Sequence, residues 1–439
     1  MRPLLLAVLA LLVLSAPAGA VPKPAVPDAT SALGAPAMAP VTGRLQVQLG
    51  IADQKPDVFS DARFRQLGVK FVRRAIAWDT FDYDWQVREV DDYFARARAA
   101  GVSPLVVFDK SRIGERRNVT PTRQQLRDAF TKFRQRYPYI TDFAGWNEPN
   151  IGGQWPFFAP QGAERLGVFY KDMKTLCPQC RILAADLVDY PNMVKFAKRV
   201  IKGAGEAPRI WGVHNYLSAN RFDASRTLAL LKAIKGEMWL TEVGGLVARR
   251  STNDTHIPQG VPHAAKVTNF IFDGLARLDR RITRVYLYHW NEDLASPTWD
   301  SGLVDGRGRA RPALARVRPA LRAGMDRRSV VLGAGFGRVR LGMTRAQAAR
   351  AGAKGVKVGY DKQGRVNRLE TKSRAWKTPG GTGVGSTSAQ VAYAHLSKNS
   401  ASACGRKTCL VGVREKGGVV SEFMLDRRKR VKSLIIRVV

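Results

Sequence analysis

Long apolar runs are nearly absent from this 439-residue chain. The one exception lies at the N-terminus, where the segment Leu4–Leu14 is almost uninterrupted and follows the basic Arg2. This run is too short to span a bilayer comfortably, and the small residues at 18–20 fit a signal-peptidase site. We therefore expect a signal peptide at 1–20, cleaved near Ala20, a secreted extracellular protein and no permanent membrane span. An uncleaved signal anchor is the alternative.

Acidic residues are scarce: 36 Asp and Glu stand against 72 Lys and Arg, a formal net charge of +36. Such a field favours anionic partners, which include nucleic acid, acidic polysaccharide and a charged cell envelope. The basic residues are spread along the chain and no nucleic-acid-binding motif accompanies them, so no nucleic-acid partner is expected. A solvated basic surface without a specific partner is the alternative.

Cysteine is also rare, and the four cysteines form two local pairs, Cys177 with Cys180 and Cys404 with Cys409. Outside the cytoplasm both pairs are predicted to be disulfides. Nothing resembling thioredoxin surrounds the Cys-Pro-Gln-Cys motif, which disfavours a redox role. No second pair of ligands completes a zinc site. We therefore expect neither a metal nor a cofactor.

A glycine-rich phosphate loop is missing after the first strand, which disfavours a doubly wound dinucleotide-binding sheet. Instead, β-rich runs alternate with amphipathic stretches from Arg44 onward. The predicted strands share strand length and high apolar content; they are Leu45–Ile51, Phe71–Trp78, Ser103–Phe108, Asp142–Trp146, Ile182–Leu187, Ile210–Tyr216, Met238–Val243 and Val285–Trp290. The predicted helices are Arg88–Ala100, Thr122–Tyr137, Gly162–Leu176, Pro191–Gly203, Ala224–Ile234 and Pro262–Leu278. Eight such units over residues 44–325 predict an α/β fold, a (β/α)₈ TIM barrel.

The composition differs at the two ends of this barrel. Residues 21–43 are rich in Ala and Pro, which is typical of a linker. Residues 328–439 are predicted to form a small basic α+β domain, and from 326 onward we count about 25 basic against about 6 acidic residues. Within it, 342–347 and 385–390 are similar in sequence; they are either two copies of a small αβ unit or a chance likeness.

Polar residues cluster where the predicted strands end, which is where a barrel of this class carries its site. Glu148 follows the fourth strand and Glu242 ends the seventh, so the two face each other across the mouth. Glycosidic cleavage needs such a pair, because one carboxylic acid protonates the departing oxygen while the other, ionised, attacks the anomeric carbon. Asn147 is placed to bond a sugar hydroxyl, and Tyr216 to orient the nucleophile.

These residues resemble the clan A glycoside hydrolases, in particular family 39-like and family 5-like members, over about residues 44–325. The likeness rests on Asn-Glu-Pro after strand four and Thr-Glu on strand seven. It implies a retaining enzyme in which Glu148 is the acid/base and Glu242 the nucleophile. His214 and Tyr216 match the His-x-Tyr of strand six, and Trp290 matches the strand-eight tryptophan that floors the sugar site.

The same resemblance extends to strand two, where Val72-Arg73 followed by Trp78 is similar to the Val-Arg…Trp segment of those families. Arg73 would then support the nucleophile, although the adjacent Arg74 leaves the assignment open. Trp155, in the loop after Glu148, is a candidate for stacking on a sugar ring. Asp109, at the end of strand three, either contacts substrate or is an exposed loop carboxylate, and the second is expected.

The predicted function is thus a secreted retaining glycosidase that hydrolyses O-glycosyl compounds, with β-linked bonds expected. Its partner is an oligo- or polysaccharide, with anionic cell-envelope polymers a further partner for the basic C-terminal domain, and a monomer is expected. The alternative is a non-catalytic carbohydrate- or envelope-binding protein on a degenerate barrel. Retention predicts that the carboxyl groups of Glu148 and Glu242 lie about 5–5.5 Å apart.

Overall fold

The computed structural model describes residues 40–41, 43–152, 161–250, 257–292, 298–323, 328–396 and 404–439. The predicted signal peptide, nearly all of the linker at 21–43 and Trp155 lie outside these ranges. None of the helices in the described ranges is both long and apolar enough to cross a membrane.

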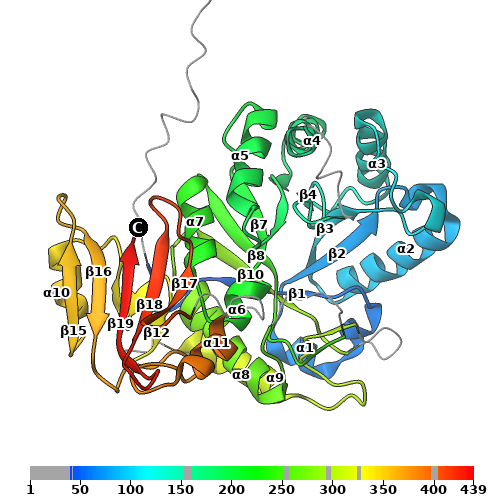
Figure 1. The fold of residues 1–439 in the computed structure, drawn as a ribbon. Helices are drawn as coiled ribbons and strands as arrows, with labels where there is room; N and C mark the ends of the chain where they lie inside the picture. The colour runs from blue at the N-terminus through cyan, green and yellow to red at the C-terminus, as the bar shows by residue number, and fades with distance from the viewer. Residues whose placement is uncertain are drawn as a thin grey trace, which may run out of the picture. The chain divides into compact units, whose positions relative to one another are not determined.

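Parallel strands from the first three quarters of the chain form a barrel (Figure 1). They are β1 (Gln48–Ala52), β2 (Phe71–Ala77), β3 (Ser103–Asp109), β4 (Asp142–Ala144), β5 (Arg181–Leu183), β6 (Asp186–Val188), β7 (Ile210–His214), β8 (Glu237–Val243) and β10 (Ile282–Tyr288). They pair in the order β5-β4-β3-β2-β1-β10-β8-β7-β6. All eight predicted strands are present, so the predicted barrel class is confirmed.

The predicted fifth strand is divided into β5 and β6, and the division closes the barrel. β5 pairs with β4, whereas β6 pairs with β7. Between them, the N–H of Ala184 donates to the carbonyl of Ile210 and that of Gly212 donates to the carbonyl of Ala185, both at 2.9 Å. The ladder is therefore continuous from β4 through the fifth strand to β7.

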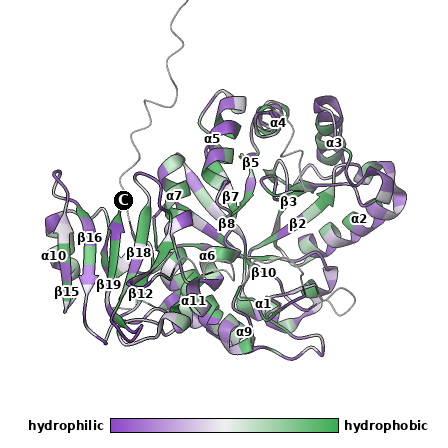
Figure 2. Cartoon of the chain, viewed as in Figure 1, coloured by the Kyte–Doolittle hydropathy of each residue, from purple (hydrophilic) through white to green (hydrophobic). Residues whose placement is uncertain are grey.

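Helices lie outside the strands and pack their apolar sides against them. They are α2 (Asp84–Ala99), α3 (Arg123–Arg136), α4 (Gly162–Leu176), α5 (Met193–Ala204), α7 (Ser225–Ala233), α8 (Val261–Phe270), which continues as a π-helical turn over Ile271–Leu275, and α9 (Pro312–Arg322). Figure 2 shows both hydrophobic and hydrophilic residues along α2 and α5, as amphipathic helices require. Two short helices that the pattern did not predict are α1 (Ala62–Leu67) and α6 (Tyr216–Asn220).

The lower end of the barrel, where the strands begin, is filled by a buried ion pair between aromatic rings. The Arg284 guanidinium lies 3.7 Å from the ring centroid of Phe71 and 3.8 Å from that of Trp239. It donates to Asp142 Oδ2 at 2.7 Å, and Arg181 donates to both oxygens of the same carboxylate. Because each charge has a partner, these polar groups can be buried at this end of the barrel.

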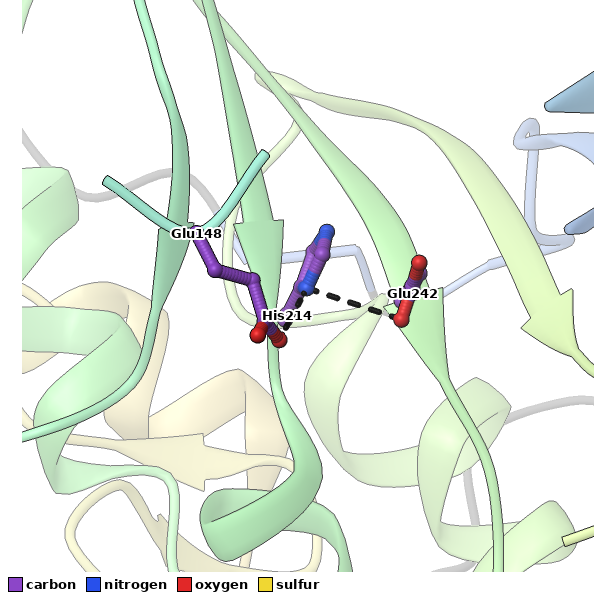
Figure 3. Close-up of side chains that lie close together, drawn as sticks. All are labelled: Glu148, His214 and Glu242. Carbon is purple, nitrogen blue, oxygen red and sulfur yellow. Dashed lines mark hydrogen bonds and ion pairs between the residues drawn. The ribbon is translucent and has the colours of Figure 1, made fainter. Parts of the chain in front are cut away.

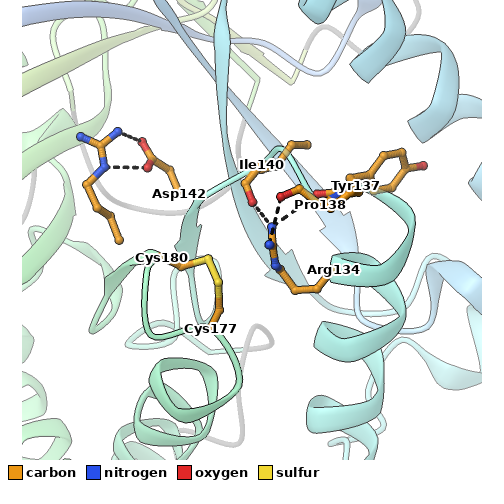
Figure 4. The surroundings of a disulfide bond; sticks show 8 residues. Arg134, Tyr137, Pro138, Ile140, Asp142, Cys177 and Cys180 are labelled. Carbon is orange, nitrogen blue, oxygen red and sulfur yellow. Dashed lines mark hydrogen bonds and ion pairs between the residues drawn. A yellow bond between two sulfur atoms is a disulfide. The ribbon is translucent and has the colours of Figure 1, made fainter.

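Both predicted disulfides are present, Cys177–Cys180 and Cys404–Cys409. The first closes the turn that follows α4, and Figure 4 shows it near the carboxylate of Asp142. The bond between residues only three apart fixes a local turn instead of joining distant parts of the chain.

The C-terminal module, residues 328–439, is built on antiparallel sheets. A three-stranded sheet contains β12 (Val330–Val331), β13 (Gly335–Phe336) and β14 (Val339–Arg340). A five-stranded sheet contains β15 (Val356–Tyr360), β16 (Val366–Thr371), β19 (Val431–Val438), β18 (Val419–Leu425) and β17 (Thr408–Gly412), in that order. With α10 (Arg345–Ala351) and α11 (Ser388–His395), these sheets confirm an α+β module.

The two similar segments of the module are structural copies. Thr344 and Gln347 form a reciprocal capping box at the start of α10, and Thr387 and Gln390 form the same box at the start of α11. In such a box each side chain bonds the backbone N–H of the other residue, which satisfies two otherwise unpaired donors. The shared Thr-x-x-Gln sequence therefore has a shared structural cause.

The copies continue into equivalent hairpin turns. Asp361 Oδ1 accepts from the backbone N–H of Arg365, and Asp426 Oδ1 accepts from that of Arg430. Each arginine then donates to the carbonyl of the glycine that opens its copy. The strands that follow, β16 and β19, pair with each other at the centre of the sheet. The two segments thus share a helix cap, a turn and a following central strand, which favours two copies of a small αβ unit over a chance likeness.

Candidate active site

Three side chains meet at the carboxyl ends of the barrel strands (Figure 3). His214 ends β7, Glu242 lies on β8 and Glu148 follows β4. His214 Nδ1 lies 2.9 Å from Glu148 Oε1 and 3.6 Å from Glu242 Oε2. One oxygen of each glutamate and this nitrogen all lie within 4.8 Å of one another. The structure therefore brings together the two glutamates that the sequence placed on opposite strands.

The backbone at Glu148 has a φ of 48°, which a residue other than glycine adopts only occasionally. Its N–H donates to the carbonyl of Asp186 at 3.0 Å, which ties the β4 loop to the fifth strand. Such conformations persist only where the surroundings hold them, and they concentrate at functional sites. The side chain of Glu148 is one-fifth exposed, so it is accessible from the mouth.

Glu242 is held by two donors, one on each carboxylate oxygen. Arg73 Nη1 donates to Oε1, and the Tyr216 hydroxyl donates to Oε2 at 3.1 Å. A guanidinium and a hydroxyl on a largely buried carboxylate fix its orientation and stabilise its negative charge. The predicted neighbours of Glu242 are both in place.

Arg73, and not the adjacent Arg74, faces the site, which resolves the choice that the sequence left open. Arg73 is fully buried and donates to Asp186, Glu242 and Asn147 Oδ1, the last at 2.7 Å. Burial alone would lower the pKa of Arg73, but the charges of Asp186 and Glu242 raise it above the usual value. Arg74 points to the opposite side of the strand, where it donates to the carbonyl of Gln54.

Asp186, which the sequence analysis missed, is the buried partner of Arg73. Its side chain has no exposed surface and accepts hydrogen bonds from Arg73 and from the Thr241 hydroxyl. A Cβ at Gly212 would lie 2.3 Å from Asp186 Oδ1, so the glycine makes room for this carboxylate. Burial by itself would raise the pKa of Asp186, but Arg73 and His214 hold it well below the usual range. A lone acid inside an apolar strand was the available signal.

His214 lies between three carboxylates. Its Nε2 is 3.2 Å from Asp186 Oδ2, on the side opposite to the two glutamates. Burial would lower the pKa of His214, but the charges of Glu242 and Asp186 raise it to about 10. These charges favour the protonated, positively charged form of the ring.

The geometry of Glu148, His214 and Glu242 alone could suit a divalent metal. An imidazolium offers no lone pair to a metal, and Arg73 already neutralises Glu242. The donor set therefore fits a metal poorly.

Asn147 is oriented by charged neighbours on both sides. Its Oδ1 accepts from Arg73, and its Nδ2 donates to Asp109 Oδ2 at 3.2 Å. Asp109 is the last residue of β3 and is only partly exposed, so the expectation of an exposed loop carboxylate is wrong. Burial raises the pKa of Asp109 to about 6. Asn147 keeps a second amide hydrogen with which to meet a substrate hydroxyl.

Trp290 belongs to the barrel core and also lines a cavity together with Asp61 and Glu292. Only 1% of its surface is exposed, its indole N–H donates to Asp61 at 3.0 Å, and its ring packs edge-on against Phe64. The role of Trp290 as the floor of a sugar site stays a prediction. Trp155, the other predicted platform, falls in the undescribed segment 153–160.

Two aromatic residues that the sequence analysis missed border the site. Tyr216 lies between them, with its ring centroid 4.7 Å from that of Trp299 and 6.1 Å from that of Tyr288. Trp299 belongs to a two-stranded antiparallel sheet in which β11 (Trp299–Asp300) pairs with β9 (Ala248–Arg249), and the Arg249 guanidinium lies 5.4 Å from the Trp299 ring. Trp299 is partly exposed and packs against Tyr216, the residue whose hydroxyl donates to Glu242.

No protein-family model matches the sequence, and no curated protein is similar to it in sequence. Among solved structures, a family 39 glycoside hydrolase from Bacteroides cellulosilyticus WH2 is similar at 14% identity and a TM-score of 0.46, over 91% of this chain and 82% of that one. GH5_18 from Streptomyces cattleya is similar at 17% identity and a TM-score of 0.46, over 66% and 84%. A structure of fungal β-1,4-galactanases is similar at 15% identity and a TM-score of 0.46, over 63% of this chain and 99% of that one.

Proposed function

We propose that this protein is a secreted retaining glycoside hydrolase that cleaves β-linked O-glycosyl compounds by double displacement, with Glu242 as nucleophile and Glu148 as acid/base. The observation that carries the proposal is the approach of one carboxylate oxygen of Glu148 to within 4.8 Å of one carboxylate oxygen of Glu242. Inverting enzymes need about 6.5–9.5 Å between these groups to admit a water, whereas retaining enzymes need only about 5–5.5 Å. The short separation supports retention.

In the first step, an oxygen of Glu242 attacks the anomeric carbon while the bond from that carbon to the glycosidic oxygen breaks. Glu148 transfers its proton to the departing oxygen, and a covalent glycosyl-enzyme remains. Arg73 and Tyr216 hold the attacking carboxylate in one orientation, which supports its role as nucleophile. The accessibility of Glu148 supports its role in exchanging protons with substrate and water.

In the second step, Glu148 removes a proton from a water molecule, which attacks the same carbon and releases Glu242. The sugar leaves with its original anomeric configuration. His214 Nδ1 lies 2.9 Å from Glu148 Oε1, and this contact holds the Glu148 carboxyl group in one orientation for both proton transfers.

Hydrolysis by residues 21–439 against aryl β-glycosides and polysaccharides, beside Glu242→Gln, tests the reaction. The anomer released first, followed by proton NMR, tests retention. Loss of turnover in the variant with retention in the parent supports the proposal, and release of the inverted anomer contradicts the mechanism. A folded parent that binds glycans and hydrolyses none would favour the alternative, a carbohydrate-binding protein on a degenerate barrel.

Export is a further part of the proposal, because the N-terminal pattern predicts a signal peptide and both disulfides suit an oxidising compartment. Appearance of the processed chain outside the cell, beginning near Val21, is the expected result. A chain that retains residues 1–20 and stays with the membrane would favour the signal anchor.

A second candidate function belongs to the C-terminal module, which we propose binds anionic cell-envelope polymers. Exposed basic residues gather at the turn between β18 and β19 and at the two residues that precede β17. We call this set the basic turn cluster; its members are Arg406, Lys407, Arg427, Arg428, Lys429 and Arg430. The cluster is joined by the Lys429 ammonium donating to the carbonyl of Gly405. The carboxylate of Asp426 accepts hydrogen bonds from the backbone N–H groups of Arg428 and Arg430 in this turn.

None of the six cluster residues forms an ion pair with a described carboxylate; the ion pairs of the module are Arg368–Glu370 and Arg437–Glu422. Six basic side chains gather around the single carboxylate of Asp426, so the net charge of the cluster is positive and favours a polyanion. Retention on immobilised acidic polysaccharide should fall for the triple change of residues 427–429 to Glu. A matched triple change of the exposed Lys354, Lys357 and Lys372 is the control. Equal loss in both would show that only net charge matters.

A further inference from the structure

One short segment, residues 216–225, has the nucleophile on one side and the C-terminal module on the other. It begins with Tyr216, whose hydroxyl donates to Glu242, and contains α6, the turn at 221–224 and the first residue of α7. α6 has only five residues, and a helix of that length has little stability of its own. Its position is therefore set by what it contacts.

On the barrel side, Asn220 binds the end of α6 to the strand that carries the nucleophile. Its Nδ2 donates to the carbonyls of Tyr216 and Gly244, both at 2.9 Å, and its Oδ1 accepts from the N–H of Leu246 at 2.8 Å. Asp189 accepts from the first N–H groups of the helix. These bonds hold both ends of α6 against the barrel. In the turn that follows, the ring of Phe222 packs edge-on against Phe270 and His263 of α8, at 5.5 Å between centroids in each case.

On the module side, His395 bonds that turn. His395 Nδ1 lies 2.6 Å from the carbonyl oxygen of Arg221, and Nε2 lies 2.6 Å from the Thr382 hydroxyl. A carbonyl only accepts, so Nδ1 carries the proton and Nε2 accepts from Thr382. The ring is buried and stacks on Phe423 at 5.7 Å between centroids. Both nitrogens and one face of the ring are therefore committed to this contact.

A second contact lies a few residues further along the turn. The carbonyl of Leu332 accepts from the N–H of Ala224 at 2.9 Å. Next to it, Gly333 has a φ of 77°, and a Cβ there would lie 2.6 Å from the backbone N of Ser225. The module thus approaches the start of α7 as closely as backbone can. Val331 and Ala334 belong to the same apolar cluster as the barrel core.

We propose that the C-terminal module is part of the catalytic apparatus, because through His395 and Leu332 it holds the 216–225 segment and so positions the Tyr216 hydroxyl on Glu242. The role of His395 is that of a positioning residue, and it rests on the proposed glycosidase function. Arg221 follows Tyr216 by five residues, about 7.5 Å along a helix. Displacements of about 1 Å at a reacting group can cost about 100-fold in rate.

Two substitutions separate the hydrogen bond from the packing. His395→Phe keeps a ring on Phe423 and loses the donor to Arg221, whereas His395→Asn keeps a donor near the position of Nδ1. On an aryl glycoside that occupies only the catalytic subsite, we expect kcat to fall about 10-fold in His395→Phe, with KM within about two-fold. His395→Asn should recover most of the loss. Equal kcat in all three proteins contradicts the proposal.

A double-mutant cycle with Tyr216→Phe tests whether the effect passes through Tyr216. If it does, His395→Phe has little further effect once the hydroxyl is gone, because coupled residues are not additive. Full additivity would overturn the proposal. Leu369→Ala, in the module core, is the matched control. It should lower the melting temperature without changing kcat.

Hydrogen exchange provides a readout that does not depend on activity. His395→Phe should speed exchange of the amides at 216–225, whereas Leu369→Ala should leave that segment unchanged. A parent with no activity on any glycoside would remove the proposed function, and the exchange result would still decide whether the module holds the segment. Unchanged exchange at 216–225 in His395→Phe would show that it does not.

Discussion

Two buried arginine–aspartate pairs occupy opposite ends of the same barrel, Arg284 with Asp142 at the lower end and Arg73 with Asp186 at the mouth. At the lower end the arginine is enclosed by two aromatic rings, and a second arginine, Arg181, completes the neutralisation. At the mouth two carboxylates remain beyond the pair, and one of them is accessible. Both ends of the barrel therefore contain a buried arginine–aspartate ion pair. Only the mouth has further carboxylates, Glu148 and Glu242, and Glu148 is accessible to solvent.

The largest expected difference between the two ends concerns turnover. Glu242→Gln should lower kcat by about 1,000-fold or more with a normal melting temperature, because the nucleophile is lost and the shape is kept. Asp142→Asn should lower the melting temperature and leave kcat of the folded enzyme near normal. Measured turnover and thermal unfolding of both variants decide the point, and residual turnover near wild type in Glu242→Gln would remove its role.

Removing the two buried arginines should separate the ends in the same way. Arg73→Met should reduce kcat about 100-fold, because Glu242 and Asp186 lose their shared cation. Arg284→Met should cost about 3–5 kcal/mol in the free energy of unfolding, because the buried carboxylate of Asp142 then keeps only Arg181, whose side chain is half exposed. Urea unfolding together with kinetics on both variants tests this, and a catalytic defect in a folded Arg284→Met protein would end the contrast.

The mouth should also respond to alkaline pH through His214, whose pKa is raised to about 10 in the folded protein. The pKa of an ordinary histidine is near 6.5. The contribution of His214 to the free energy of unfolding is therefore complete below about pH 6.5 and is lost as the pH rises through about 10. Asp186→Asn removes one of the charges that raise this pKa, so the alkaline loss should begin at lower pH. Unfolding free energies from pH 6 to 10 for both proteins test the shift; identical profiles would contradict it.

A pH effect of opposite sign is expected from His395 in the C-terminal module. Burial lowers the pKa of His395 to about 4, even though its bond to the Arg221 carbonyl opposes the shift. The unfolded chain then binds a proton before the folded one does, so stability is complete above about pH 6.5 and falls by roughly 3 kcal/mol toward pH 4. In His395→Phe this part of the acid decline should disappear, while that from His263, whose pKa burial also lowers to about 4, should remain.

The smallest expected effect concerns the aromatic residues at the rim. Trp299→Ala should raise KM about 5-fold with little change in kcat, because stacking of an aromatic side chain on a sugar face contributes only about 1 kcal/mol per ring beyond burial. Trp290→Phe, a change in the core, should alter the melting temperature and leave KM unchanged. A KM effect from Trp290 instead of Trp299 would support the platform that the sequence suggested.

Local patterns in the sequence were sufficient for much of the fold. The apolar runs predicted all eight strands, and the bounds predicted for α4 are those observed. The short Cys-x-x-Cys spacing predicted a pairing that any fold would permit. Short elements, in which no hydrophobic period can be recognised, were missed: α6 has five residues, and Asp189 and Asn220 bond it to the barrel.

For the site, the sequence determined which residue types end which strands, and hence that Glu148, His214 and Glu242 would meet at one mouth. The tertiary structure alone decided that Arg73 and not Arg74 reaches the nucleophile, that Asp186 is its buried partner and that Trp290 lies in the core. Those contacts join residues 113 and 169 positions apart. Hydrophobic periodicity reports only which side of a strand or helix is buried, whereas the identity of a partner across a barrel is fixed by packing and charge neutralisation in the folded chain.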